Sequence, residues 1–270
     1  MNLPAFLYGT AWKENATERL TRMAIGEGFR GIDTANQRKH YFEAGVGAAV
    51  RDAIASGVVS REELFLQTKF TYADSQDERI SYDPRAPYAT QVQQSFASSL
   101  HHLGVDSIDS YVLHGPSRRR GLGDEDREVW RAMEALHAAN KTRSLGVSNV
   151  ALDQLDELWS FATVKPGFVQ NRCYARSGWD RDVRAFCRLH GIVYQGFSLL
   201  TANLRELQRP AFQSIVARTG KTPAQIVFRF AMQVGMLPLT GTTSRAHMRE
   251  DLASTTFTLS DEDVRIIDEL

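Results

Sequence analysis

The clearest indication of the fold is the sequence GFRGIDTANQRKHYFEAGVG at residues 28–47. The segment begins with a short apolar strand that ends on Asp33, continues as a polar loop containing His40 and Tyr41, and enters a helix at about Glu43. An acid at the carboxyl end of a strand, with a phenol just beyond it, is typical of the way a parallel α/β protein builds a site.

Two later strands also end on residues that carry chemistry. LFLQTKF ends at Lys69 and SIDSYVLHGP reaches His114 at its tip. Side chains from separate strand ends converge only if those strands are neighbours in one barrel or sheet. The sequence therefore predicts that Asp33, Tyr41, Lys69 and His114 meet.

The same pattern repeats along the chain: an apolar run, a loop and an amphipathic helix. The predicted strands are residues 6–9, 30–33, 64–69, 108–114, 144–148, 168–171, 192–197 and 236–239. Near-continuous apolar strands alternating with helices favour a parallel sheet covered by helices, and eight such units close a (β/α)₈ TIM barrel. A doubly wound sheet is the alternative, but the first turn, GTAWKEN, lacks the GxGxxG fingerprint. We expect a single α/β domain over residues 1–270.

Composition limits the classes of function. The chain has 32 basic and 32 acidic residues, so no bulk charge attracts nucleic acid or an anionic membrane. No apolar run approaches the length of a membrane span. Its N-terminus has no basic region followed by a long apolar segment, and its 2 cysteines form no CxxC motif. We expect reduced thiols and a cytoplasmic protein.

Eight short motifs carry a resemblance to a known family. In chain order they are GFRGIDTA, QTKF, IDSYVLHGP, SLGVSN, VQN, GFSLL, LPLTGTTS and LSDEDV. Together they span nearly the whole chain and resemble the aldo-keto reductases. The resemblance implies reduction of a small aldehyde or ketone by a nicotinamide dinucleotide, with NADPH favoured and NADH possible.

The resemblance also implies roles for the four converging residues. Tyr41 is the expected general acid, because a phenol holds its proton at neutral pH. Lys69 would lower the pKa of Tyr41, Asp33 would fix the lysine, and His114 would orient the carbonyl. The loop before Tyr41 is longer than in most family members, which leaves His40 as an alternative proton donor.

Cofactor contacts follow by position from the resemblance. The nicotinamide is expected at Ser148, Asn149, Gln170 and Phe197, and the pyrophosphate is expected to run along Ser198, Leu199 and Thr201. The adenosine and phosphate end is expected at Thr240, Gly241, Thr242, Thr243, Ser244, Arg245, Glu250 and Asp251. Hydroxyls and backbone N–H groups entering a helix N-terminus form a sound phosphate site. Phe197 would stack on the nicotinamide ring.

The expected partner is a small-molecule carbonyl substrate bound in an aromatic pocket. Loop residues expected to border the mouth of this pocket are Trp12, His40, Tyr72, Tyr82 and Trp179. The basic run 118–120 beside His114 is interpreted as a solvated loop. Either a monomer or a dimer is compatible with the sequence.

Three other functions use parts of the same pattern. A metal-dependent hydrolase would need HxH or clustered His/Glu spacing, which is missing, so we expect no metal site. A Schiff-base aldolase would need a depressed pKa at Lys69, whereas a nearby aspartate raises it. The remaining alternative is an NADP-binding barrel that acts as a sensor or regulatory subunit with little turnover.

Overall fold

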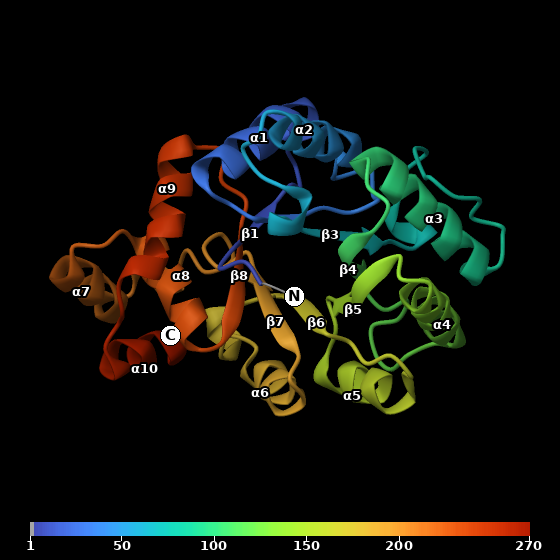
Figure 1. The fold of residues 1–270 in the computed structure, drawn as a ribbon. Helices are drawn as coiled ribbons and strands as arrows, with labels where there is room; N and C mark the ends of the chain where they lie inside the picture. The colour runs from blue at the N-terminus through green and yellow to red at the C-terminus, as the bar shows by residue number, and fades with distance from the viewer. Residues whose placement is uncertain (1–2) are drawn as a thin grey trace.

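The computed structural model describes residues 3–270, which form a closed barrel of eight parallel strands surrounded by helices (Figure 1). The strands follow one another around the barrel in chain order. They are β1 (Leu7–Gly9), β2 (Gly31–Asp33), β3 (Phe65–Phe70), β4 (Ile108–Leu113), β5 (Thr142–Ser148), β6 (Phe168–Arg172), β7 (Val193–Phe197) and β8 (Met236–Thr240). All eight predicted strands are confirmed, with ends shifted by at most two residues.

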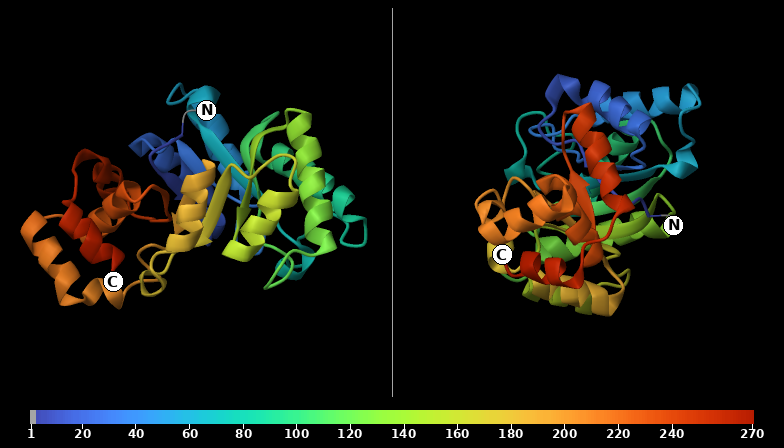
Figure 2. Two further views of the ribbon diagram at one scale, coloured as in Figure 1. Left: turned by 90° about the horizontal axis from the view of Figure 1, so that it is seen from below. Right: turned by 90° about the vertical axis from the view of Figure 1, so that its left-hand side faces the viewer.

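Helices connect the strands and cover the outside of the barrel. They are α1 (Thr17–Glu27), α2 (Glu43–Ala55), α3 (Tyr88–Leu103), α4 (Asp124–Ala138), α5 (Leu152–Phe161), α6 (Arg181–His190), α7 (Pro210–Thr219), α8 (Pro223–Gln233), α9 (Arg245–Ala253) and α10 (Asp261–Asp268). Helices α7 to α10 gather on one side of the barrel (Figures 1 and 2). No helix within residues 3–270 is long and apolar enough to cross a membrane.

Two glycines in the opening stretch are required by the backbone. Gly28 ends α1 at a φ of 112°, a left-handed conformation that side chains with a Cβ rarely adopt. Gly47 lets α2 pack directly against the end of α3, because a Cβ there would lie 2.0 Å from the His102 carbonyl oxygen. These contacts fix the helix that follows the loop carrying Tyr41.

Alternation along the strands divides the barrel interior into layers. Leu7, Phe65, Phe168 and Leu237 form an apolar cluster at the amino-terminal end. Moving two residues along β3 and β6 leads from this cluster to the buried Gln67 and Gln170. Because side chains alternate across a strand, the next inward positions lie at the carboxyl-terminal mouth. The barrel is therefore apolar at its base and polar at its mouth.

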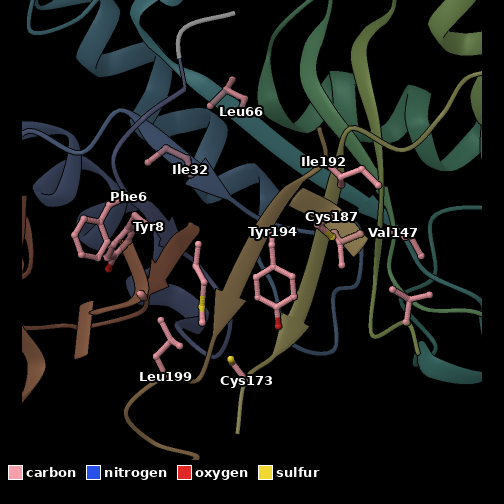
Figure 3. Close-up of a cluster of buried hydrophobic side chains, with 14 of the residues drawn as sticks. Phe6, Tyr8, Ile32, Leu66, Val147, Cys173, Cys187, Ile192, Tyr194 and Leu199 are labelled. Atoms are coloured by element: carbon pink, nitrogen blue, oxygen red, sulfur yellow. The ribbon is translucent and has the colours of Figure 1, made fainter. Parts of the chain in front are cut away.

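The opposite faces of the strands pack under the helices as the main core (Figure 3). Tyr8, Ile32 and Leu66 belong to this cluster, as do the two free cysteines, Cys173 and Cys187. Burial raises the pKa of both thiols to about 12, which makes them poor nucleophiles at neutral pH. The cysteines are core residues.

Candidate active site

A large cleft of about 1510 Å³ opens at the carboxyl ends of the strands. This is the end at which (β/α)₈ barrels carry their sites. Among the predicted residues that line it are Trp12, Asp33, His40, Tyr41, Tyr72, His114, Ser148, Asn149, Gln170, Phe197, Ser198, Leu199, Thr201, Thr240, Gly241, Thr242, Thr243, Glu250 and Asp251. Loops that are far apart in the sequence therefore meet in one cleft.

Lys69 and Asp33 form a buried ion pair beside the cleft. The ammonium of Lys69 is fully buried and donates to Asp33 Oδ1 at 2.6 Å and to the Thr34 carbonyl oxygen at 2.8 Å. Burial lowers the pKa of Lys69, and the charge of Asp33 opposes that shift. A lysine carries three N–H groups, and these two hydrogen bonds use two of them. Lys69 itself is absent from the cleft lining in the described chain.

Tyr41 lies between this pair and His114. Its ring centroid is 5.3 Å from Lys69 Nζ and 5.9 Å from the centre of the His114 ring. Burial, with a smaller contribution from the charge of Asp33, raises the pKa of Tyr41 above its ordinary value. The expectation was a lowered pKa at Tyr41; in this arrangement the pKa is raised instead, because burial desolvates the phenolate. Tyr41 is a protonated phenol at neutral pH.

A buried hydroxyl holds His114. Thr71 Oγ1 and His114 Nδ1 are 2.7 Å apart, and Thr71 is nearly inaccessible to solvent. Burial, aided by the Lys69 charge, lowers the pKa of His114 to about 3, so its ring is neutral. A threonine hydroxyl can donate or accept, so this contact is compatible with either tautomer of His114. In the tautomer whose Nδ1 accepts from Thr71, the ring carries an N–H at Nε2, which is the donor that a carbonyl oxygen needs.

Three glutamines support Asp33 from inside the barrel. Gln67 and Gln170 donate to Asp33 Oδ1 at 2.7 and 3.0 Å, beside the Lys69 ammonium. Gln195 exchanges hydrogen bonds with Gln67 and accepts from Gln170 at 2.9 Å. Several hydrogen bonds to one carboxylate oxygen restrict the orientation of the side chain. The network therefore keeps Asp33 in place as the partner of Lys69.

His40 faces a different direction from Tyr41. Its ring lies 3.9 Å from that of Trp12, centre to centre, and its Nδ1 is 2.9 Å from Gln37 Oε1. Its carbonyl accepts from the Trp12 backbone N–H at 2.7 Å. Trp12 is 72% exposed and has a φ of 61°, a strained conformation that concentrates at functional sites. His40 and Trp12 together form the rim of the cleft.

The expected nicotinamide contacts lie on adjoining strand ends. Ser148 Oγ donates to the Gln170 carbonyl oxygen at 2.7 Å, and Asn149 Nδ2 donates to the His114 carbonyl oxygen at 2.8 Å. The amide oxygens of Asn149 and Gln170 carry no hydrogen bond within residues 3–270. Phe197 is partly exposed at the end of β7. Two amide acceptors therefore face the cleft beside a flat aromatic ring.

The opposite end of the cleft lies between β8 and α9. Thr240 donates to Asp251 at 2.8 Å, and burial raises the pKa of Asp251 to about 6. Two residues of the predicted phosphate site, Ser244 and Arg245, are absent from the cleft lining in the described chain. Ser244 is the N-cap of α9, and the exposed Arg245 pairs with Glu27 at 3.2 Å.

The prediction that Tyr82 and Trp179 border the mouth is wrong, because both are core residues. Tyr82 donates to the Thr71 carbonyl oxygen at 2.7 Å, and Trp179 Nε1 donates to the Ile267 carbonyl oxygen at 2.7 Å. Aromatic side chains whose polar atom finds a backbone partner are readily buried. Tyr72 does line the cleft, and its hydroxyl donates to Asp126 at 2.8 Å.

The residues of the cleft and its support that sequence reasoning missed include Lys13, Thr71 and Arg172, as well as the buried Gln67 and Gln195. Lys13 is buried, lines the cleft and donates to the Gly241 carbonyl oxygen at 2.7 Å. Thr71 and Arg172 each lie two positions beyond an inward-facing residue, Lys69 and Gln170 respectively. Extending the same alternation by one step would have found both. Residues 3–270 contain no cluster of His, Cys, Asp and Glu suited to a metal ion.

Comparisons with known proteins give one consistent result. The model of the "Aldo/keto reductase family" matches residues 7–270. An uncharacterized oxidoreductase, YtbE, of Bacillus subtilis is 29% identical, and a glyoxal reductase of the same organism is 30% identical. Each alignment covers 100% of this chain and 90% of the relative. A silkworm (Bombyx mori) aldo-keto reductase solved with NADPH superposes with a TM-score of 0.84. It is 26% identical, and the match covers 99% of this chain and 84% of that one.

Proposed function

This chain belongs to the aldo/keto reductase family, and we propose that it reduces a small aldehyde or ketone to an alcohol with NADPH, using Tyr41 as the proton donor. The observation that carries the residue assignment is the meeting of a protonated phenol, a buried ion pair and a neutral imidazole at one side of the cleft.

The proposed chemistry divides between the cofactor and the protein. When bound, NADPH supplies the hydride for the carbonyl carbon. His114 Nε2–H donates a hydrogen bond to the carbonyl oxygen, which orients the substrate and stabilises the charge that develops there. Tyr41 gives its proton to that oxygen. The Lys69 ammonium then stabilises the resulting phenolate, and Asp33 keeps Lys69 charged.

The residues at the β8 end suit a dinucleotide phosphate. Lys13 is a buried cation with no carboxylate within ion-pair distance in residues 3–270, and it lies beside Gly241. A Cβ at Gly241 would lie 3.7 Å from the ammonium, so glycine leaves the space beside the cation open. Hydroxyls of Thr242 and Thr243 line the same region. Lys13 and these threonines would hold phosphate oxygens.

Lys13 makes cofactor binding dependent on pH. Burial lowers the pKa of Lys13 to about 8. The protonated form attracts phosphate, so the Kd for NADPH is expected to stay constant below about pH 8 and to rise above it. Lys13→Gln should raise the Kd for NADPH roughly 10- to 100-fold at neutral pH, which corresponds to the loss of one hydrogen bond to a charged group. The variant should also remove the pH dependence, as measured by fluorescence titration.

Lys13→Arg is the matched control, because arginine stays charged at every accessible pH. It should bind NADPH with a Kd that no longer rises above pH 8. An unchanged Kd in Lys13→Gln would show that Lys13 does not meet the cofactor.

In the proposed mechanism Thr71 sets the tautomer of His114. Thr71→Val keeps the shape of the side chain but removes the hydroxyl, and we expect kcat/KM to fall about 5- to 10-fold, equivalent to one lost hydrogen bond. Nitrogen NMR of the His114 ring should show a shift away from the Nε2–H tautomer. Thr71→Ser retains the hydroxyl and should retain both the tautomer and the rate. An unchanged His114 spectrum in Thr71→Val would contradict the assignment.

The reaction class can be tested by NADPH oxidation with aldehydes, ketones and dicarbonyls. Glyoxal belongs in the panel because a relative carries the name glyoxal reductase. Consumption of NADPH with formation of the matching alcohol would support the proposal. Tight NADPH binding without turnover of any substrate would instead favour the sensor role.

A further inference from the structure

Arg172 is a cation at the mouth of the cleft that the proposed chemistry does not use. It is the last residue of β6, and the inward side of that strand carries Phe168 at the base of the barrel and Gln170 in the middle. Alternation places the Arg172 side chain one layer above Gln170. The residue lines the cleft. Its charge therefore lies over the carboxyl end of the barrel.

The guanidinium is held by an aromatic face and by no acid. It lies 5.4 Å from the centre of the Phe197 ring, its neighbour in the strand register. No carboxylate within residues 3–270 approaches it to ion-pair distance, whereas Lys69 is paired with Asp33 and Arg118 with Glu125. A guanidinium that rests on an aromatic ring keeps its planar fork of donors free for a carboxylate or phosphate.

The position of β6 indicates which molecule the charge meets. In a closed barrel of eight strands, β6 lies opposite β2, the strand that leads into the Tyr41 loop. The phosphate site proposed for NADPH lies at β8, with Lys13 and Gly241. A substrate whose carbonyl contacts Tyr41 and His114 would reach Arg172 if it extended across the mouth, whereas a cofactor whose nicotinamide stacks on Phe197 would approach Arg172 from the side.

The charges at the mouth favour an anion. Lys69 and Asp33 cancel each other, and His114 is neutral. Arg172 lies opposite the reacting groups without a carboxylate at ion-pair distance in the described chain. The other charged residues of the lining lie elsewhere along the cleft: Asp74 follows β3, Lys13 follows β1, and Glu250 and Asp251 belong to α9. Glu125 also lines the cleft, but its carboxylate accepts hydrogen bonds from Arg118 and Ser117.

We infer that Arg172 recognises an anionic group on the substrate, so that the preferred substrates are carbonyl compounds bearing a carboxylate or a phosphate ester at the end remote from the carbonyl. This inference rests on the proposed carbonyl reduction. A phosphate of the cofactor presents the same chemistry to a guanidinium, and the test must separate the two.

The test uses two pairs of aldehydes that differ only in charge: terephthalaldehydic acid with its methyl ester, and succinic semialdehyde with its methyl ester. The ratio of kcat/KM for acid over ester is measured at saturating NADPH, and the Kd for NADPH is measured separately. In the wild type we expect the acid to be favoured in at least one pair. Arg172→Gln should lower that ratio roughly 10- to 100-fold, the range for a lost hydrogen bond to a charged group.

Arg176→Gln is the matched control. Arg176 also lies over an aromatic ring, at 5.1 Å from the centre of Tyr174, but it does not line the active-site cleft. Its substitution should leave the acid-to-ester ratio unchanged. Arg172→Lys should restore only part of the ratio, because an ammonium lacks the planar fork.

Each remaining result overturns the inference in a recognisable way. If the acid-to-ester ratio of both pairs is the same in the wild type and in Arg172→Gln, Arg172 does not bind the anionic group of the substrate. If, in addition, the Kd for NADPH rises in Arg172→Gln, the anion is a cofactor phosphate. If the wild type reduces none of the four aldehydes or the wider carbonyl panel, the proposed function itself fails.

Discussion

Tyr41→Phe is expected to abolish most of the turnover while leaving cofactor binding intact. The substitution removes only the hydroxyl of a side chain that lies 5.3 Å from Lys69 Nζ, measured to its ring centre. Loss of a positioned general acid costs about 10²–10⁴-fold in kcat. We expect a fall in that range, with the Kd for NADPH changed by no more than about twofold, because phenylalanine preserves the ring and its packing.

His40→Ala provides the matched comparison for this experiment. His40 stacks on Trp12 and bonds Gln37 rather than facing Lys69. Its loss should change KM through the rim of the cleft and leave kcat within about tenfold of the wild type. A collapse of kcat in His40→Ala with turnover retained in Tyr41→Phe would identify His40 as the acid and contradict the account.

Lys69→Met is expected to impair both the fold and the chemistry. It leaves Asp33 buried with two glutamine donors and no counter-charge. Removing one partner of a buried ion pair costs about 3–5 kcal/mol. We expect a loss of this size in the free energy of unfolding, measured by urea denaturation, together with loss of turnover.

The double variant Asp33→Asn/Lys69→Met separates stability from catalysis. With both charges gone, most of the unfolding free energy should return, because neutral replacements of a buried pair are often tolerated. Turnover should stay low, because no ammonium remains to stabilise a phenolate at Tyr41. Recovery of activity in the double variant would show that Lys69 acts only as a structural residue.

Strand periodicity predicted the parts of the site that depend on it. Asp33, Lys69 and His114 each lie at or next to a strand end, and parallel strand ends in one barrel must point to the same mouth. The eight-unit repeat predicted the barrel for the same reason. Thr71 and Arg172 follow the same alternation. They lie two residues beyond Lys69 and Gln170, the last site residues predicted on those strands.

The directions of side chains on long loops and the pKa values of buried groups could not be predicted from the sequence. Tyr82 and Trp179 lie on irregular segments whose direction no periodicity encodes, and their polar atoms found backbone partners in the core. The pKa of Tyr41 depends on how completely the folded chain desolvates its hydroxyl. Arg245 has the right charge for phosphate, but its distance from Glu27 is a property of the packed helices α1 and α9.

The most direct test follows the hydrogen atom that NADPH delivers. The wild type is incubated with its best carbonyl substrate and NADPH in which both hydrogens on the transferring carbon of nicotinamide are replaced by deuterium, and the alcohol is analysed by mass spectrometry. The account predicts an alcohol carrying one deuterium on the former carbonyl carbon, formed far more slowly by Tyr41→Phe. An unlabelled alcohol, or NADPH that binds but yields no alcohol from any carbonyl compound, would contradict it.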